Sequence, residues 1–289
     1  MIQGGIRAFL SILLLAAGYR ESTAASRPGQ LSIPTDLRPH VDRSISVGRL
    51  MFSQDRASAI ATDLLAAKLG TLDGQGLGGY LAVAKALGSG PSVGGWEVLF
   101  FSEGIPRVLY RIGVGDDRAS RPNYRREMPP APIVSENLAL IAARQSAIAA
   151  VGSFTRPVNP IVLSEGAGSL KRIVVYLMAG TTTPNVAVLG RHYRVNVSQD
   201  GRTVEDVLPL SKTELELPLS SPTGGRPEAL FVTHVLTDYP LESHVFASLL
   251  NSIPIVVETA RGRWLVAGDS ISLLPTPKPP SESPGVRRR

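Results

Sequence analysis

The sequence predicts an α+β fold, with two main helices in the N-terminal half packed on antiparallel strands and a C-terminal half that is mostly β. Apolar residues recur at helical spacing in two stretches, 53–69 and 135–151. After residue 152 the chain consists of short runs of β-branched residues, which are typical of strands. The 23 prolines and 28 glycines supply the many turns that such strands need.

The first 25 residues are predicted to be a signal peptide. Arg7 precedes a short apolar run, and small residues follow, with cleavage expected after Ala24 or Ala25. The run is too short to anchor the chain stably in a bilayer, so no stable membrane span is expected after cleavage. The protein is therefore expected to be periplasmic or secreted.

The rest of the chain is expected to form three parts. Residues 26–132 are predicted to be an N-terminal lobe of a helix plus a hairpin, and residues 133–274 an α+β main body. Residues 275–289 form a Pro/Arg tail, which is predicted to be disordered because it holds too few apolar residues to pack.

In the N-terminal lobe, Ser53 is placed to cap a helix that ends at Gly70, after an extended lead-in that reaches residue 42. A short Ala/Leu-rich helix is predicted near residues 80–87. Two runs of β-branched and aromatic residues, joined by a Gly-Ile-Pro turn, then predict a hairpin over 96–114.

The polar, proline-rich stretch 116–132 is predicted to be a linker. Ser135 then caps the second helix. Because a helix followed by hairpin strands occurs in 53–114 and again in 135–198, an internal duplication is one interpretation, and a single α+β domain is the other. In the main body, strands are predicted at residues 161–163, 172–179, 186–198, 203–208 and 214–217, with a hairpin turn at 199–201.

The stretch Leu230–Leu274 combines a strand, a polar connection, an amphipathic segment and closing strands. The closing strands are predicted to form a hairpin that turns at residues 261–263. Trp264 is expected to be buried there, because apolar residues stand on both sides of the turn.

Composition excludes several classes of function. The chain has no cysteine, which rules out disulfides, thiolate metal sites and a cysteine nucleophile. Its 30 basic and 24 acidic residues give a net charge of +6, half of which lies in the terminal arginines 287–289. No basic stripe with interleaved aromatic residues is present, so a nucleic-acid partner is not expected.

Several known catalytic motifs are also missing. Gly74-x-Gly76-x-x-Gly79 matches the dinucleotide pattern formally, but a predicted helix, not a strand, precedes it. These glycines are therefore predicted to form a turn, and no cofactor is expected. The sequence has no Ser-x-x-Lys, His-Glu-x-x-His or Walker motif.

His234, Glu242 and His244 are the candidate catalytic residues. Two imidazoles and a carboxylate are a set that holds a metal ion, of unknown identity here, or that acts as acid and base. Against this, His234 lies in an apolar run where core histidines are common. Glu242 and His244 are two residues apart, so they diverge on a helix.

The leading functional hypothesis is an exported binding or interaction protein without catalysis, which acts through a β-sheet surface or an exposed edge. Its ligand is an unknown protein or small molecule. The alternative is a periplasmic hydrolase or metal-dependent enzyme centred on the His234–His244 segment.

Overall fold

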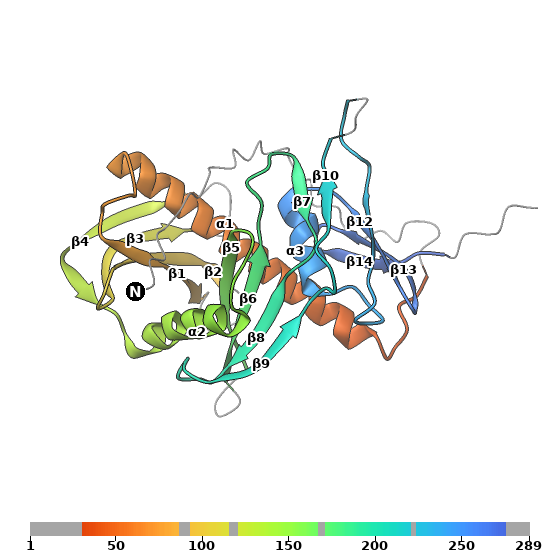
Figure 1. Ribbon diagram of the computed structural model, residues 1–289, viewed down its shortest axis with the longest axis horizontal. Helices are drawn as coiled ribbons and strands as arrows, with labels where there is room; N and C mark the ends of the chain where they lie inside the picture. Colours follow the sequence, from red (N-terminus) through yellow and green to blue (C-terminus); the bar gives the residue numbers. More distant parts are fainter. Residues whose placement is uncertain (1–30, 87–92, 116–120, 167–170, 221–223, 276–289) are drawn as a thin grey trace, which may run out of the picture.

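The computed structural model describes residues 31–86, 93–115, 121–166, 171–220 and 224–275. Within these residues it contains three helices and four sheets, and the fold is α+β (Figure 1). The predicted signal peptide lies outside the described residues, and so does the predicted tail after Pro275.

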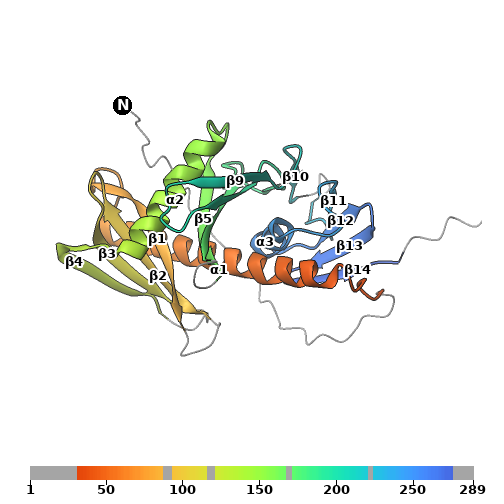
Figure 2. The same ribbon diagram turned by 90° about the horizontal axis from the view of Figure 1, so that it is seen from below.

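Helix α1 (Arg38–Leu69) runs along the length of the molecule, as Figures 1 and 2 show. Its second half packs on the first sheet, and its first half packs on helix α3 (Glu242–Asn251). The two helices approach closely at Gly48, where an added Cβ would lie 2.5 Å from the Cβ of Val245. A larger residue at position 48 would therefore push the helices apart.

Two antiparallel four-stranded sheets lie side by side, and each follows a helix in the chain. The strand order is β1-β2-β3-β4 in the first sheet and β5-β6-β8-β9 in the second. The first sheet contains β1 (Leu77–Ala86), β2 (Val93–Ser102), β3 (Arg107–Val114) and β4 (Asn123–Pro132). The second contains β5 (Val158–Glu165), β6 (Arg172–Ala179), β8 (Tyr193–Val197) and β9 (Val204–Pro209).

Side chains on the two faces of these sheets belong to two different cores. Residues such as Val98 and Tyr176 pack with α1, whereas Leu81, Phe101 and Val175 pack with helix α2 (Ser135–Val151) on the other face. The α1 core contains residues from both sheets, so the two sheets share one helix layer.

The third sheet has the order β11-β12-β13-β14, and α3 covers one of its faces. Strands β11 and β12 are parallel, with α3 as the connection between them, and the remaining pairs are antiparallel. Its strands are β11 (Leu230–Thr233), β12 (Ile255–Thr259), β13 (Gly262–Ala267) and β14 (Ser270–Leu273). A small fourth sheet pairs β7 (Val186–Val188) with β10 (Glu216–Pro218).

Much of the predicted arrangement is confirmed. The helix over 135–151, the hairpin of β2 and β3, and the strand over 172–179 stand where the sequence predicts them. The order strand, helix and closing strands of Leu230–Leu274 is also observed. The closing hairpin turns at Ala260–Arg261, one residue earlier than predicted.

The prediction of an extended segment up to residue 42 was wrong, because α1 begins at Arg38. Val41, Ile45 and Met51 follow helical spacing and pack against other elements. Ser53 is not an N-cap but a mid-helix residue, and its hydroxyl accepts a hydrogen bond of 2.8 Å from Nε1 of Trp96. Pro39 is compatible with the helix because it lies in the first turn.

The helix predicted over 80–87 was also wrong, because residues 77–86 form β1. Leu81 and Ala82 are both buried, one toward α2 and the other toward α1. Pairing with β2 and burial on both faces override the helix propensity of alanine and leucine.

The predicted linker over 116–132 was wrong for residues 123–132, which form β4, while residues 116–120 lie outside the described residues. Strand β4 is an edge strand, and its pairing with β3 shifts register between the partners of Val108 and Tyr110. Prolines are tolerated on edge strands and at bulges, so the proline-rich sequence does not exclude a strand.

The single strand predicted over 186–198 is split into β7 and β8. At Gly190 between them, an added Cβ would lie 2.1 Å from the carbonyl oxygen of Thr213. Arg191 has a positive φ of 57°, so the chain changes direction here.

We predict that Trp264→Ala destabilises the fold by about 3–5 kcal/mol. The Trp264 side chain is fully buried opposite Val257, and its Nε1 donates a 3.0 Å hydrogen bond to Oγ1 of Thr259. Denaturant unfolding measures the change. Leu265→Ala is the matched control on the other face of β13, where about 1 kcal/mol is expected. Equal effects of the two substitutions would contradict the burial of Trp264.

Candidate functional site

The predicted site residues His234 and His244 meet where the chain passes from β11 into α3. Their rings are 4.9 Å apart between centroids and nearly perpendicular, at 85°. Both side chains are buried. The structure therefore brings together the two histidines that the sequence singles out.

Hydrogen bonds determine which ring nitrogen carries the proton in each neutral histidine. The single hydroxyl proton of Thr237 goes to the carbonyl oxygen of Tyr239, at 2.6 Å. Thr237 must then accept from Nε2–H of His234, at 3.0 Å. In His244, Nδ1 accepts from the backbone N–H of Leu241 at 3.0 Å, so the ring proton is on Nε2.

Glu242, the third predicted site residue, is not directed at the histidines. Its carboxylate is 1% exposed and accepts hydrogen bonds from Tyr176 Oη at 3.0 Å and from Arg194 Nη1 at 3.1 Å. Arg43 Nη1 on α1 is 3.6 Å away. The divergence expected for residues two apart on a helix is therefore observed, and Glu242 connects α3 with α1, β6 and β8.

A third buried histidine, His192, lies close enough to influence His244. Burial lowers the pKa of His192 to about 4, while a hydrogen bond to the backbone of Val188 opposes that shift. Burial lowers the pKa of His244 to about 3, and the charges that would form on His234 and His192 lower it further. Burial also lowers the pKa of His234. All three imidazoles are neutral at neutral pH.

These histidines form no metal-binding set within the described parts of the chain, where no group of three or more His, Cys, Asp or Glu side chains is placed to hold an ion. The carboxylate of Glu242 is engaged by Tyr176 and Arg194, so it is not hydrogen-bonded to either imidazole. A catalytic role of His234, Glu242 and His244 stays a prediction.

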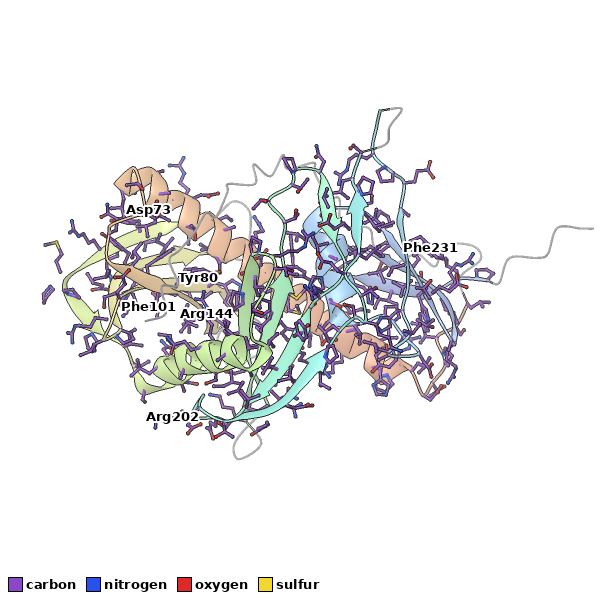
Figure 3. All side chains as sticks on the ribbon, in the orientation of Figure 1. Asp73, Tyr80, Phe101, Arg144, Arg202 and Phe231 are labelled. Atoms are coloured by element: carbon purple, nitrogen blue, oxygen red, sulfur yellow. The ribbon has the colours of Figure 1, made fainter. Side chains whose placement is uncertain are left out.

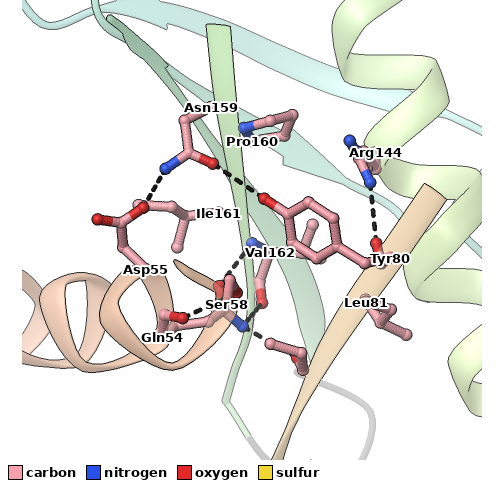
Figure 4. Close-up of a pocket in the computed structure, with 11 residues that line it drawn as sticks. Gln54, Asp55, Ser58, Tyr80, Leu81, Arg144, Asn159, Pro160, Ile161 and Val162 are labelled. Carbon is pink, nitrogen blue, oxygen red and sulfur yellow. Dashed lines mark hydrogen bonds between the residues drawn. The ribbon is translucent and has the colours of Figure 1, made fainter. Parts of the chain in front are cut away.

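A second polar cluster lies at the seam where β1 of the first sheet faces β5 of the second, shown in Figure 4. Gln54 reaches into this seam from α1. Its Nε2 donates to the carbonyl oxygens of Ala82 on β1 (3.1 Å) and Val162 on β5 (2.9 Å). Its Oε1 accepts from the backbone N–H of Val162 at 3.1 Å. One side chain thus satisfies backbone groups of two strand edges.

Beside Gln54, four polar side chains from four elements converge on a cavity of ≈ 10 Å³. This volume holds about one water molecule. Asn159 donates to Asp55 and accepts from Tyr80 Oη at 3.2 Å, and Arg144 Nη1 donates to the carbonyl oxygen of Tyr80 at 2.8 Å. The Arg144 guanidinium also lies 5.1 Å from the centre of the Tyr80 ring.

Burial raises the pKa of Asp55 to about 6, and the hydrogen bond from Asn159 opposes the shift. A carboxyl group with a raised pKa in a polar cavity is a recurrent feature of functional sites. Sequence reasoning missed this cluster, because its members come from four segments that share no motif.

A third feature is the open edge of β11. The N–H groups of Leu230 and His234 bond to Pro254 and Glu258 on the side of β12. In a parallel pair, successive residues alternate in direction, so the backbone groups of Phe231 and Thr233 face away from β12. None of the described residues forms a backbone hydrogen bond to these outward groups.

Apolar side chains accompany this edge. Phe231 and Val235 are 51% and 61% exposed. On the face away from α3, Phe231 is a cross-strand neighbour of Val256, which in turn neighbours Leu265. Figure 3 shows Phe231 beside the third sheet, at the opposite end of the molecule from Phe101.

Comparison of the chain with protein-family models, curated proteins and solved structures gave no significant match. None of the helices in the described ranges is long and apolar enough to cross a membrane. The functional argument therefore depends on the geometry of these three features.

We predict that Asp55→Asn stabilises the protein at about pH 8 by about 2 kcal/mol and changes little at about pH 4. The folded-state pKa of Asp55 is raised, so the wild-type protein loses stability as pH rises from the unfolded-state value of 3.8 through about 6. Asparagine stays neutral and still accepts a hydrogen bond from Asn159. Unfolding measured across this pH range gives the difference.

The matched control is Asp63→Asn, since Asp63 is an exposed aspartate on the same helix. Because the Asp63 side chain is exposed, its substitution should change the stability by less than about 0.5 kcal/mol. A constant effect of Asp55→Asn at both pH values would show that the Asp55 carboxyl is not desolvated.

Proposed function

We propose that the protein is an exported binding protein that takes up an extended segment of a partner chain at β11. The segment would add a further strand to the third sheet, and no catalytic step is involved. This proposal depends mainly on one observation. Strand β11 is an unprotected edge, whereas the other edges of the large sheets are blocked within the described residues.

The edges of the first two sheets are protected in different ways. Strand β4 carries Pro129, Pro130 and Pro132, and prolines cannot donate ladder hydrogen bonds. Strand β9 exposes Glu205 and Asp206, charges of the kind that discourage pairing.

The two inner edges, β1 and β5, face each other across Gln54, which bonds the carbonyl group of Ala82 on β1 and both backbone groups of Val162 on β5. In the third sheet, Leu31 forms a bridge to Leu273 on β14, with a 3.0 Å hydrogen bond from its N–H. The strands of the small fourth sheet are three residues long, and short edges resist addition. Strand β11 has four residues, and none of them is a proline or a charged residue.

The chemistry of β11 suits strand addition. Phe231 and Thr233 present outward N–H and C=O groups, and main-chain hydrogen bonds give this mode of recognition its affinity. Alternate side chains of the added strand would meet the apolar row that begins at Phe231, and this gives specificity. Arg263 lies 5.7 Å from the centre of the Phe231 ring and holds Glu258 at 3.0 Å, so the row is bordered by an ion pair.

The exported location is supported by the sequence alone. Arg7, the short apolar run after it and the small residues at 24 and 25 match a cleavable leader. Recovery of the mature N-terminus in the periplasmic fraction of a Gram-negative host would test this part of the proposal.

We predict that Thr233→Pro abolishes strand binding and leaves the fold intact. Proline removes the outward N–H of Thr233, which β12 does not use, so the β11–β12 ladder keeps its hydrogen bonds. Peptides selected from a displayed random library against the wild-type protein serve as the probe. Their affinity for the variant should fall by at least about tenfold, a loss of about 1.4 kcal/mol.

Thr233→Ala is the matched control, because it shortens the same side chain and keeps the N–H. It should bind selected peptides nearly as well as the wild type, and both variants should melt within a few degrees of it. Selected peptides that bind Thr233→Pro and Thr233→Ala equally well would refute strand addition at β11.

A further inference from the structure

We propose that the contacts of His234 and His244 hold the segment 234–244, which connects β11 to α3, and that acid breaks these contacts. We call this pair of histidines the clasp. Acid opens this connection, and the edge of β11 then loses the fixed geometry that an added strand needs. The consequence for the added strand rests on the proposed function, whereas the opening itself does not.

Several of the hydrogen bonds that hold the connection involve the two imidazoles, and Thr259 Oγ1 also donates to the carbonyl oxygen of Asp238 at 3.1 Å. His234 anchors Thr237, and Thr237 in turn holds the carbonyl group of Tyr239. His244 anchors Leu241, the residue before the first turn of α3. The perpendicular contact of the two rings joins the beginning of the connection to its end. A change at either ring therefore affects the whole segment.

The added proton has a defined destination in His244. Nε2 already carries a proton, so the second proton must bind Nδ1, which accepts from the backbone N–H of Leu241. Protonation converts this acceptor into a donor that faces another donor, and the bond that caps α3 is lost. In His234, the second proton also binds Nδ1, and it places a charge against the ring of His244.

The elements around the clasp supply no neutralising charge. From α1, His40 stacks on Tyr239 at 4.8 Å, and Arg43 is directed to Glu165 and Glu242. From the turn before β8, the facing titratable group is His192.

Each nearby carboxylate is either bound to another side chain or exposed to solvent, so none of them neutralises a charge on the two rings. Glu242 on α3 is bonded to Tyr176 and Arg194, and Glu258 on β12 holds Arg263. Asp238, within the connection, is exposed. No carboxylate contributes to the pKa of either histidine: burial lowers both pKa values, and the neighbouring imidazoles further lower that of His244.

The sign and size of the effect follow from linkage. A histidine with a lowered folded-state pKa binds its proton more readily when the segment opens, so the folded connection loses stability as pH falls below about 6.5. With the pKa of His244 at about 3, the opening equilibrium should rise about 30-fold between about pH 7.5 and about pH 5. Protonation of His234 would add to this rise.

Amide hydrogen exchange of the wild-type protein, corrected for the intrinsic pH dependence, measures the opening. We expect the protection of residues 230–241 to fall about 30-fold at the lower pH. The β2–β3 hairpin in the same sample is the internal control, and its protection should change much less. Unchanged protection of 230–241, or an equal fall in both segments, would overturn the clasp.

The variant His244→Gln separates titration from hydrogen bonding. Its Oε1 is able to accept from the N–H of Leu241, as a glutamine at the third helical position does in a capping box, and it does not titrate. Its connection should keep its protection at about pH 5, so that most of the 30-fold change is lost. A variant as acid-sensitive as the wild type would overturn the assignment to His244.

If His244→Gln does not fold, the ring nitrogens of the wild-type protein give a second measurement. The ¹⁵N signals of His244 should remain those of a neutral ring at about pH 5 in the closed state. Signals of a charged His244 ring in a fully protected connection would overturn the proposal. Since the exchange experiment contains no peptide, failure of strand binding at β11 would refute the proposed function without changing the result for the clasp.

Discussion

The amide of Gln54 determines how the two large sheets are held together. Strands β1 and β5 face each other without a ladder between them, and the Gln54 side chain bonds three of their backbone groups. An apolar residue there would leave these buried groups without partners, at a cost of about 1–3 kcal/mol for each. Because α1 supplies Gln54 from one side and α2 supplies Arg144 from the other, both helix layers depend on the same seam.

The buried Asp55 and the buried histidines change the stability of the folded state in opposite directions as pH changes. Asp55 is more easily accommodated when it is protonated, so it favours the folded state at low pH. The imidazoles of His192 and His244 are more easily accommodated when they are neutral, so they favour the folded state at higher pH. Between about pH 4 and about pH 6, the two histidines stabilise the folded state more per unit of pH than Asp55 destabilises it. The summed contribution of these groups is therefore expected to rise with pH up to about 6.5 and to change little above it.

Local patterns in the sequence were sufficient for some elements and not for others. The helix over 135–151 has an apolar helical pattern that ends at Gly152, and the strand over 172–179 has a β-branched run, although Ser135 is the first helical residue and not the predicted cap. In contrast, β1 has the alanine and leucine content of a helix, and β4 has the prolines of a linker. Their strand structure comes from pairing with β2 and β3, which a local pattern does not contain.

The same distinction applies to the candidate sites. His234 and His244 are close in sequence, so a short sequence pattern was enough to predict them as candidate site residues. Whether Glu242 joins them depends on the direction of a helix turn and on arginines from α1 and β8. The cluster at Asp55 and the open edge of β11 exist only once sheets are assembled. Neither has a sequence signature, because the relevant groups are backbone atoms or side chains from separate elements.

The close approach of α1 and α3 at Gly48 has a consequence for how the chain comes to be folded. The first half of α1 is made early in synthesis, but the surface on which it packs is made almost last. Until then the apolar positions of this half-helix have no native partner, and contacts between such distant segments form slowly. A nascent chain would thus carry an exposed apolar helix face for most of its synthesis. Such a chain is prone to aggregation, so its yield in cells should depend on factors that shield the N-terminal helix until residue 251 has emerged.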